Sequence, residues 1–218
     1  MRLTSPSQSP NSLVRPKLRL ADDVTLYFAR HGETEANVAK RFQGHTIDTP
    51  LTERGLKQTK ILAKILEHNV KDPAVLKYVA SPLPRARLTM ELVRDHLGLP
   101  IDKFKTDKRI SEIDLGKWDG LTHKQARALD PKIYEKREHD KWNVRVPGGE
   151  SYEDVADRAE RWVHSLKADT FAITHGAFTR ILRGLFTGLD AQEMSDLDEP
   201  QGVVFRVRGN RVKRLDKP

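Results

Sequence analysis

Short apolar runs alternate with longer segments of helical spacing from residue 24 onward. The run at 24–29 is almost entirely apolar, β-branched or aromatic and has no polar alternation, which is typical of a strand buried on both faces. Shorter runs of the same kind occur at 77–80 and 170–174. Strands separated by helices favour a parallel sheet. The expected fold class is α/β: a three-layer sandwich with a mainly parallel sheet and helices on both faces.

Four longer segments carry apolar residues at helical spacing. Thr52 and Ser151 are well placed to cap the first turn of two of them, and Gly98 is suited to end another. The expected helices cover residues 52–66, 84–97, 151–166 and 177–186.

Two regions depart from this alternation. Residues 203–215 alternate in polarity on either side of a Gly-Asn pair, which predicts a hairpin at the edge of the sheet. The region at about 105–150 is partly irregular and rich in charge, with short helical patterns at 122–129 and 131–137. We expect this region to form a small helical lid inserted into the sandwich.

The basic charge of the chain is concentrated at its two ends. The net charge is +8, of which residues 1–22 carry +3 and residues 206–218 carry +5. Residues 1–22 also contain three prolines and almost no apolar periodicity, so we expect them to form a disordered basic tail ahead of one domain at 23–218. Solvated ends explain this charge without a specific nucleic-acid partner; weak contact with polyanions is the alternative.

Composition narrows the class of protein further. The chain has no cysteine, which excludes disulfides and thiolate zinc sites and favours a cytoplasmic protein. Its apolar runs are shorter than the roughly 20 residues of a membrane-spanning helix, so no membrane partner is expected. The histidines away from the strand ends show no paired spacing for a metal. The sequence leaves the oligomeric state open.

Charged residues gather where the predicted strands end. Arg30 and His31 follow the first strand, and His175 follows the run at 170–174, with a glycine after each histidine. Arg85 lies near the start of the helix that follows another strand. Because the carboxyl ends of parallel strands meet at one edge of a sheet, we expect these side chains in one crevice. Guanidinium groups and helix starts both suit phosphate, so the pattern predicts a site for a tetrahedral dianion.

Several motifs together carry a family resemblance. They are Arg30-His31-Gly32-Glu33-Thr34 with Asn37, Gln43-Gly44, Ser81-Pro82-Leu83 with Arg85-Ala86, Glu112 with Gly116, Trp118 and Gly120, Gly148-Gly149-Glu150-Ser151, and His175-Gly176 with Arg180. In this order and spacing, over residues 24 to about 188, the chain resembles the histidine phosphatase superfamily, the phosphoglycerate-mutase-like proteins. One departure is Ala177, which stands where the family often has a second glycine.

The resemblance implies a role for each matched residue. His31 would attack phosphorus and carry a phosphohistidine, and Glu112 would act first as general acid and then as base. The residues expected to bind the phosphoryl oxygens are Arg30, Asn37, Arg85 and His175. The residues expected to contact the rest of the substrate are Gln43, Gly44 and Gly176. The resemblance implies no metal and no cofactor.

Alternatives stay open for some of these positions. Asp114 and Glu150 are rival proton donors, because only geometry decides which carboxyl meets the leaving group. Asn37 could simply cap or turn its loop, and Arg85 could be an ordinary charge at a helix start.

The expected function is hydrolysis of a small phosphomonoester. The short lid favours access of water, and hence hydrolysis over return of the phosphoryl group to a bound intermediate. A phosphoglycerate-mutase-type transfer is the alternative within the same chemistry. An inactive binding or scaffold protein and a polyanion-binding module are the alternatives of another class.

Overall fold

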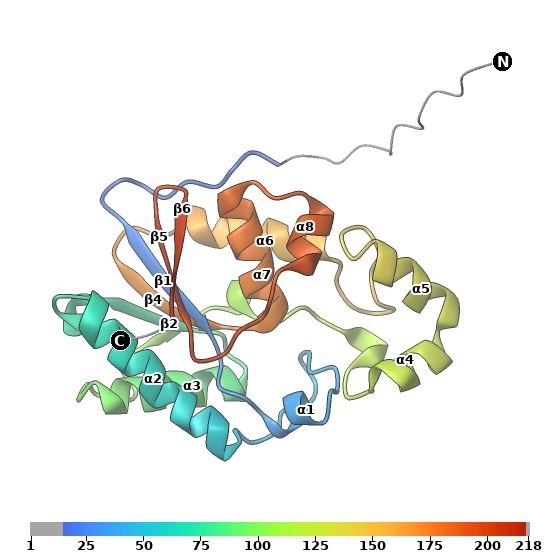
Figure 1. The fold of residues 1–218 in the computed structure, drawn as a ribbon, viewed down its shortest axis with the longest axis horizontal. Coiled ribbons are helices and arrows are strands. Elements are labelled where there is room, and N and C mark those ends of the chain that lie inside the picture. Colours follow the sequence, from blue (N-terminus) through green and yellow to red (C-terminus); the bar gives the residue numbers. More distant parts are fainter. Residues whose placement is uncertain (1–14, 217–218) are drawn as a thin grey trace.

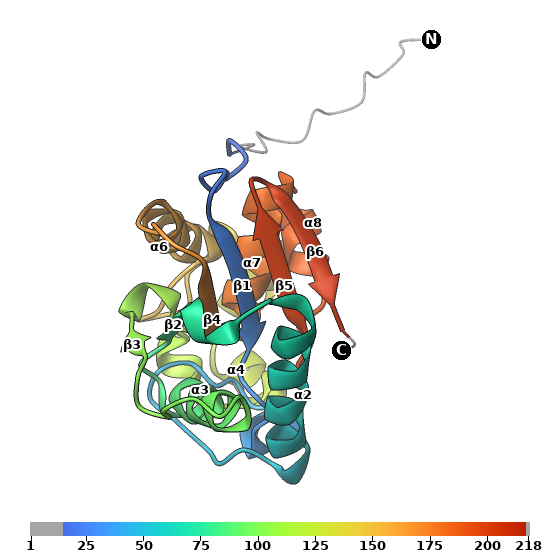
Figure 2. The same cartoon turned by 90° about the vertical axis from the view of Figure 1, so that its left-hand side faces the viewer.

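A six-stranded sheet forms the centre of the molecule in the computed structural model, which describes residues 15–216. The strand order is β3-β2-β4-β1-β5-β6 (Figures 1 and 2). The strands are β1 Thr25–Arg30, β2 Lys77–Ala80, β3 Lys105–Thr106, β4 Thr170–Thr174, β5 Val204–Arg208 and β6 Arg211–Leu215. β1, β4, β2 and β3 are parallel, whereas β5 and β6 form an antiparallel hairpin beside β1. The predicted α/β class, mainly parallel sheet and edge hairpin are confirmed.

The two faces of the sheet bury separate sets of side chains. Along β1, Leu26 and Phe28 join the core beneath α6 and α7, whereas Tyr27 and Ala29 join the core beneath α2 and α3. Full burial of one such large apolar side chain stabilises the fold by about 2–3 kcal/mol. Figure 1 shows the two helix groups on opposite sides of the strands. The helices are α2 Glu53–Asn69, α3 Pro84–His96, α6 Tyr152–His164, α7 Gly176–Thr187 and α8 Ala191–Asp196.

The helix starts agree with the capping residues of the sequence. The Thr52 side chain accepts a hydrogen bond from the backbone of Gly55 at the start of α2. Ser151 and Asp154 form a reciprocal capping box at the start of α6, which satisfies two backbone donors that the helix leaves free. Gly188 ends α7 in the left-handed conformation at φ 74°, which glycine adopts without steric cost. Within residues 15–216, no helix is long and apolar enough to cross a membrane.

Within the described part of the chain, three short helices do not pack on the faces of the sheet but lie at one end of it. α1 Glu35–Val38, α4 His123–Leu129 and α5 Pro131–His139 lie along the lower and right side of Figure 1. Below α4 and α5, Trp118 is buried, with its ring 5.5 Å from that of Tyr134 and its Nε1 donating to Asp130. The helical lid is therefore present, but it is smaller than the expected 105–150, because β3 pairs with β2 and so belongs to the sheet.

The prediction of a disordered tail is wrong for residues 15–22. Leu18 and Leu20 are buried in the core, and the Leu18 backbone donates to Leu185. Arg15 pairs with Asp157 at 2.7 Å and contacts the ring of Trp142. Two alternating leucines beside prolines give too short a pattern to stand out in the sequence. Residues 1–14, the rest of the predicted tail, lie outside the described residues.

Candidate active site

The two strand-end histidines lie side by side. β1 and β4 are neighbours, and the backbone of His31 donates to the Thr174 carbonyl at 2.9 Å. The ring centroids of His31 and His175 are 5.1 Å apart, and both side chains are buried. Within residues 15–216 neither ring nitrogen of His175 has a hydrogen-bond partner. Buried polar atoms without partners are rare, which indicates groups kept for a ligand.

The surroundings of His31 favour a neutral ring with an unprotonated Nε2. Nδ1 lies 2.8 Å from the Gly32 carbonyl, and a carbonyl can only accept, so Nδ1 carries the proton. Nε2 then presents its lone pair toward Arg85, whose Nε is 3.3 Å away. Burial first, and then the charges of Arg85 and Arg30, hold the pKa of His31 well below its ordinary value. A neutral imidazole with an unprotonated Nε2 is the form that can attack an electrophile.

Arg85 is held in place by contacts on every side of its guanidinium group. It is buried at the start of α3, and its Nη1 pairs with Asp48 at 2.9 Å. Its Nη2 donates to the carbonyls of Gln43 and Gly44 at 3.1 and 2.9 Å. These contacts fix the guanidinium plane beside His31 without any ligand. Such preorganised charge costs no rearrangement when negative charge develops nearby.

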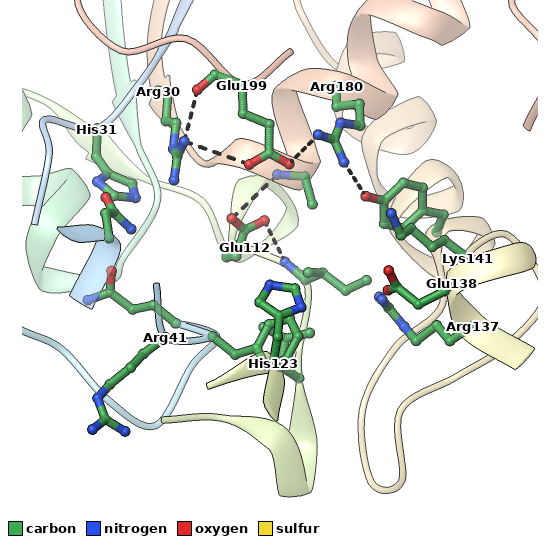
Figure 3. A pocket seen from close by; sticks show the side chains of 17 residues that line it. Arg30, His31, Arg41, Glu112, His123, Arg137, Glu138, Lys141, Arg180 and Glu199 are labelled. Atoms are coloured by element: carbon green, nitrogen blue, oxygen red, sulfur yellow. Dashed lines mark hydrogen bonds and ion pairs between the residues drawn. The ribbon is translucent and has the colours of Figure 1, made fainter. Parts of the chain in front are cut away.

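A cavity of about 340 Å³ opens beside Arg30 and His31, whereas Arg85 and His175 lie outside its lining. Figure 3 shows Arg30 and His31 on one side and Glu112 near the centre. Asn37 and Gln43 also belong to the lining. The cavity is therefore continuous from the strand-end histidine to a buried carboxyl group.

Glu112 is a buried carboxyl group in the lining of this cavity. Its Oε1 accepts from the Ile113 backbone at 2.9 Å, and its Oε2 lies 3.4 Å from the Ala177 backbone nitrogen. Burial, and then the charge of Glu199, raises the pKa of Glu112. A raised pKa keeps a carboxyl protonated closer to neutral pH, as a general acid requires.

The two rival carboxylates are engaged elsewhere. Glu150 accepts two hydrogen bonds from Arg158 and one from the Asp114 backbone, and the Asp114 side chain accepts from the Gly116 backbone. Neither rival lines the cavity. Of the three acids weighed from the sequence, geometry therefore favours Glu112.

Asn37 and Gln43, which the sequence predicted at the substrate, both line the cavity but also contact neighbouring residues of the protein. Asn37 completes the capping box of α1 by accepting from the backbone of the N-cap residue Thr34, close to its alternative interpretation, and it also lines the cavity. Gln43 lines the cavity, but its side chain already contacts Thr34 and Thr49.

Both glycines among the candidates contribute through their backbone. Gly44 lies outside the lining and accepts from Arg85 through its carbonyl. Gly176 begins α7 directly after His175, where a Cβ would lie 2.4 Å from the Glu199 carboxylate. The helix start can therefore approach that carboxylate only because residue 176 has no side chain.

The outer part of the cavity contains basic side chains to which the sequence assigned no role. They are Arg41, His123, Arg137, Lys141 and Arg180, with the carboxylates Glu138 and Glu199 among them (Figure 3). Tyr152 belongs to the same lining. The one available signal was the spacing of Arg137 and Lys141, four residues apart in the charged lid segment. No group of three or more histidines and carboxylates in the described chain is arranged to hold a metal ion.

Comparison with known proteins identifies the family. The family model of the histidine phosphatase superfamily, branch 1, matches residues 26–213. The chain belongs to this superfamily. Human 6-phosphofructo-2-kinase/fructose-2,6-bisphosphatase 3 is 35% identical over 186 residues, which are 84% of this chain and 33% of that protein. The chain thus spans about a third of the length of that curated relative.

Solved structures of the superfamily have the same fold over nearly their whole length. The α-ribazole phosphatase of Shigella flexneri is 25% identical, with a TM-score of 0.75 over 88% of this chain and 96% of that one. Mycobacterial glucosyl-3-phosphoglycerate phosphatase is 27% identical, with a TM-score of 0.71 over 87% of this chain and 96% of that one. The predicted membership of the histidine phosphatase superfamily, among its phosphatases, is confirmed.

Proposed function

We propose that the protein hydrolyses phosphate monoesters through a phosphohistidine on His31, with Glu112 as general acid and base. The observation that carries the proposal is the unprotonated Nε2 of His31, which accepts from Arg85, lies beside His175 and belongs to a residue that lines the same cavity as Glu112. A phosphohistidine mechanism is typical of this superfamily.

In the first step, His31 Nε2 attacks phosphorus and the bond from phosphorus to the ester oxygen breaks. The carboxyl proton of Glu112 moves to that oxygen, so the substrate leaves as an alcohol. Arg30, Arg85, His175 and Asn37 surround the phosphoryl oxygens and stabilise the charge that the transition state spreads over them.

In the second step, water attacks phosphorus while Glu112, now a carboxylate, accepts a proton from that water. The bond from phosphorus to Nε2 breaks, and inorganic phosphate leaves with His31 neutral again. The low pKa of His31 suits this return, because the ring stays unprotonated and ready for the next substrate. Arginines supply the positive charge that a metal ion supplies in other phosphotransfer enzymes, so we expect activity without added metal.

The substrate we propose carries a second anionic group on its alcohol part. Arg137 is buried at the outer end of the cavity, packs over the rings of Trp118 and Tyr152, and has an Nε without a partner among the described residues. Lys141 lies in the same lining. Buried cations need a counter-charge, and a second phosphate or carboxylate provides one. The name of the human relative, a fructose-2,6-bisphosphatase, agrees with a bisphosphorylated sugar.

A panel of esters in chelator tests this function. We expect the wild-type protein to release phosphate from sugar bisphosphates with a KM about 30-fold lower than from matched monophosphates, since one charge-assisted hydrogen bond contributes about 2 kcal/mol. Glu112→Gln should slow release of poor leaving groups far more than release of p-nitrophenol. Activity that required a metal, or a bisphosphorylated primer as a mutase does, would contradict the proposal.

We also propose a cytoplasmic location, which the cysteine-free composition supports. Fractionation of cells that express the full-length protein tests it. Recovery with a membrane or secreted fraction would overturn it.

A further inference from the structure

A second carboxylate, Glu199, lies in the active-site cavity between two arginines. Its backbone carbonyl accepts from Arg30 Nη1 at 2.8 Å, and its Oε2 lies 3.7 Å from the same nitrogen. Its Oε1 lies 3.2 Å from Arg180 Nη2 (Figure 3). Arg180 in turn donates to the Tyr152 hydroxyl at 2.9 Å. Glu199 therefore joins a phosphate-facing arginine to one at the outer wall.

The segment that carries Glu199 is fixed by further contacts. It connects α8 to β5. Arg183 pairs with Asp198 at 2.7 Å, and Arg180 Nε donates to the Leu197 carbonyl at 2.8 Å. Gln201 donates to the His31 carbonyl and to Asn37, each at 3.1 Å. The position of the Glu199 carboxylate is thus built into the site.

Glu199 and Glu112 approach the same turn of α7. Glu112 Oε2 faces the Ala177 backbone nitrogen at 3.4 Å. Glu199 Oε2 packs against Gly176, where an added Cβ would be 2.4 Å away. The two carboxyl groups therefore meet at consecutive residues, in a place that only a glycine leaves open.

We propose that Glu199 is a positioning residue whose negative charge keeps Glu112 in its protonated, proton-donating form. The inference rests on the proposed role of Glu112 as general acid. Two carboxyl groups near one another in a buried site do not both ionise readily. Glu199 pairs with two arginines, whereas the hydrogen-bond contacts of the Glu112 carboxyl oxygens among the described residues are all with backbone N–H groups. The negative charge therefore belongs on Glu199, and the proton on Glu112.

Other charged groups around Glu112 act against this effect. Arg30 and Arg85 lower its pKa, whereas burial and Glu199 raise it, and the net direction is upward. The remaining titratable neighbours are Arg180 on α7, Tyr152 on α6, Arg158 and His45 at the Glu112 carbonyl, and His31 and His175, whose low pKa keeps both rings neutral. Loss of the Glu199 charge would leave Arg30 and Arg180 without their shared anion, which favours ionised Glu112.

Single-turnover release of the alcohol, from about pH 5 to about pH 9, tests the proposal because it reports the phosphorylation step alone. With glycerol 2-phosphate, a poor leaving group, we expect Glu199→Gln to release the alcohol about tenfold more slowly than wild type near pH 8 and at a similar rate near pH 5. With p-nitrophenyl phosphate, whose leaving group needs no proton, the two proteins should differ by less than about twofold. Glu199→Asp should restore most of the alkaline activity.

Two further variants separate the possible failures. Glu112→Gln should show the same dependence on leaving group at every pH; without it, the proposed function of Glu112 fails, and this inference fails with it. If Glu112→Gln behaves as expected but Glu199→Gln loses activity equally with both substrates and at all pH values, Glu199 only anchors its segment and the inference alone is overturned. Glu91→Gln, which removes a surface carboxylate paired with Arg87, should match wild type throughout.

Discussion

The inner and outer halves of the cavity differ in how their charged groups are held. In the inner half, His31 and Arg85 come from a strand end and a helix start that the sheet brings together, and each is bonded to neighbouring groups. In the outer half, Arg137 and Lys141 come from α5 and the turn after it, away from the sheet (Figure 1).

On the proposed mechanism, this difference separates the reacting groups from the groups that select the substrate. Arg85 uses its hydrogen bonds within the protein to hold His31 and its neighbours in one rigid arrangement, which we propose binds the phosphoryl group. The Nε of Arg137 has no partner in the described chain, so its charge is available to a ligand. Side chains on the outer half can therefore change the preferred substrate without disturbing the reacting groups, and the two halves should respond to mutation in different ways.

Loss of the nucleophile should give the largest effect. We expect His31→Ala to lower kcat by about a thousandfold or more with every substrate, because the proposed phosphoryl intermediate forms on His31. Steady-state phosphate release checks this, with thermal unfolding to show that the variant folds. Turnover within about tenfold of wild type would show that His31 in the inner half of the cavity is not the nucleophile.

Arg85→Lys should give the next largest effect. Lysine keeps the charge but loses the fork that contacts His31, Asp48 and two carbonyls, so we expect kcat to fall about 100-fold. The unfolding free energy should also fall by about 2–4 kcal/mol, since buried acceptors lose their donor. Arg87→Lys on the exposed face of the same helix is the matched control, and equal effects of the two substitutions would contradict the account.

Arg137→Met should affect substrate choice alone. The methionine keeps apolar packing near Trp118 but removes the charge, so KM for a sugar bisphosphate should rise about 10- to 30-fold. Values of kcat, and all constants for p-nitrophenyl phosphate, should stay within about twofold. Steady-state kinetics with both substrates check this, with the exposed Arg127→Met of α4 as the control. An equal loss with both substrates would show that the two halves of the cavity act as one functional unit, which contradicts their proposed separation.

The smallest expected effect is on stability in acid. Burial lowers the pKa of His31 and of His175, so below about pH 6.5 the unfolded chain binds protons that the folded protein does not. The free energy of unfolding should therefore decrease as the solution becomes more acidic, and each ring should contribute up to about 1.4 kcal/mol per pH unit. Urea unfolding across this range should show a flatter slope for His175→Gln and an unchanged slope for the exposed His164→Gln. An unchanged slope for both would mean that His175 is protonated in the fold.

The inner half was predictable from the sequence because periodicity and topology determine it. A buried strand followed by Arg30 and His31, and a second followed by His175, must meet at one sheet edge if the strands are parallel. Glu112 was named through the family resemblance, and only the coordinates separate it from Glu150. The outer half depends on how α4 and α5 pack, which no repeat of apolar residues specifies.

The residues missed by the sequence interpretation share one physical reason. Glu199 lies in a segment without regular structure. Its proposed role depends on ion pairs with Arg30 and Arg180, which are not adjacent to it in the sequence. Leu18 and Leu20 pack onto a core that forms elsewhere. In each case, long-range contacts rather than local pattern decide the position of the side chain.

Trapping the intermediate tests the central claim most directly. A substrate with a radiolabelled phosphoryl group is mixed with excess wild-type protein, and turnover is stopped with alkali. We expect label on the protein at His31 that survives alkali, is lost in acid, and is absent from His31→Ala. Rapid release of labelled phosphate with no labelled protein at any time, or label that persists in His31→Ala, would contradict the proposed mechanism.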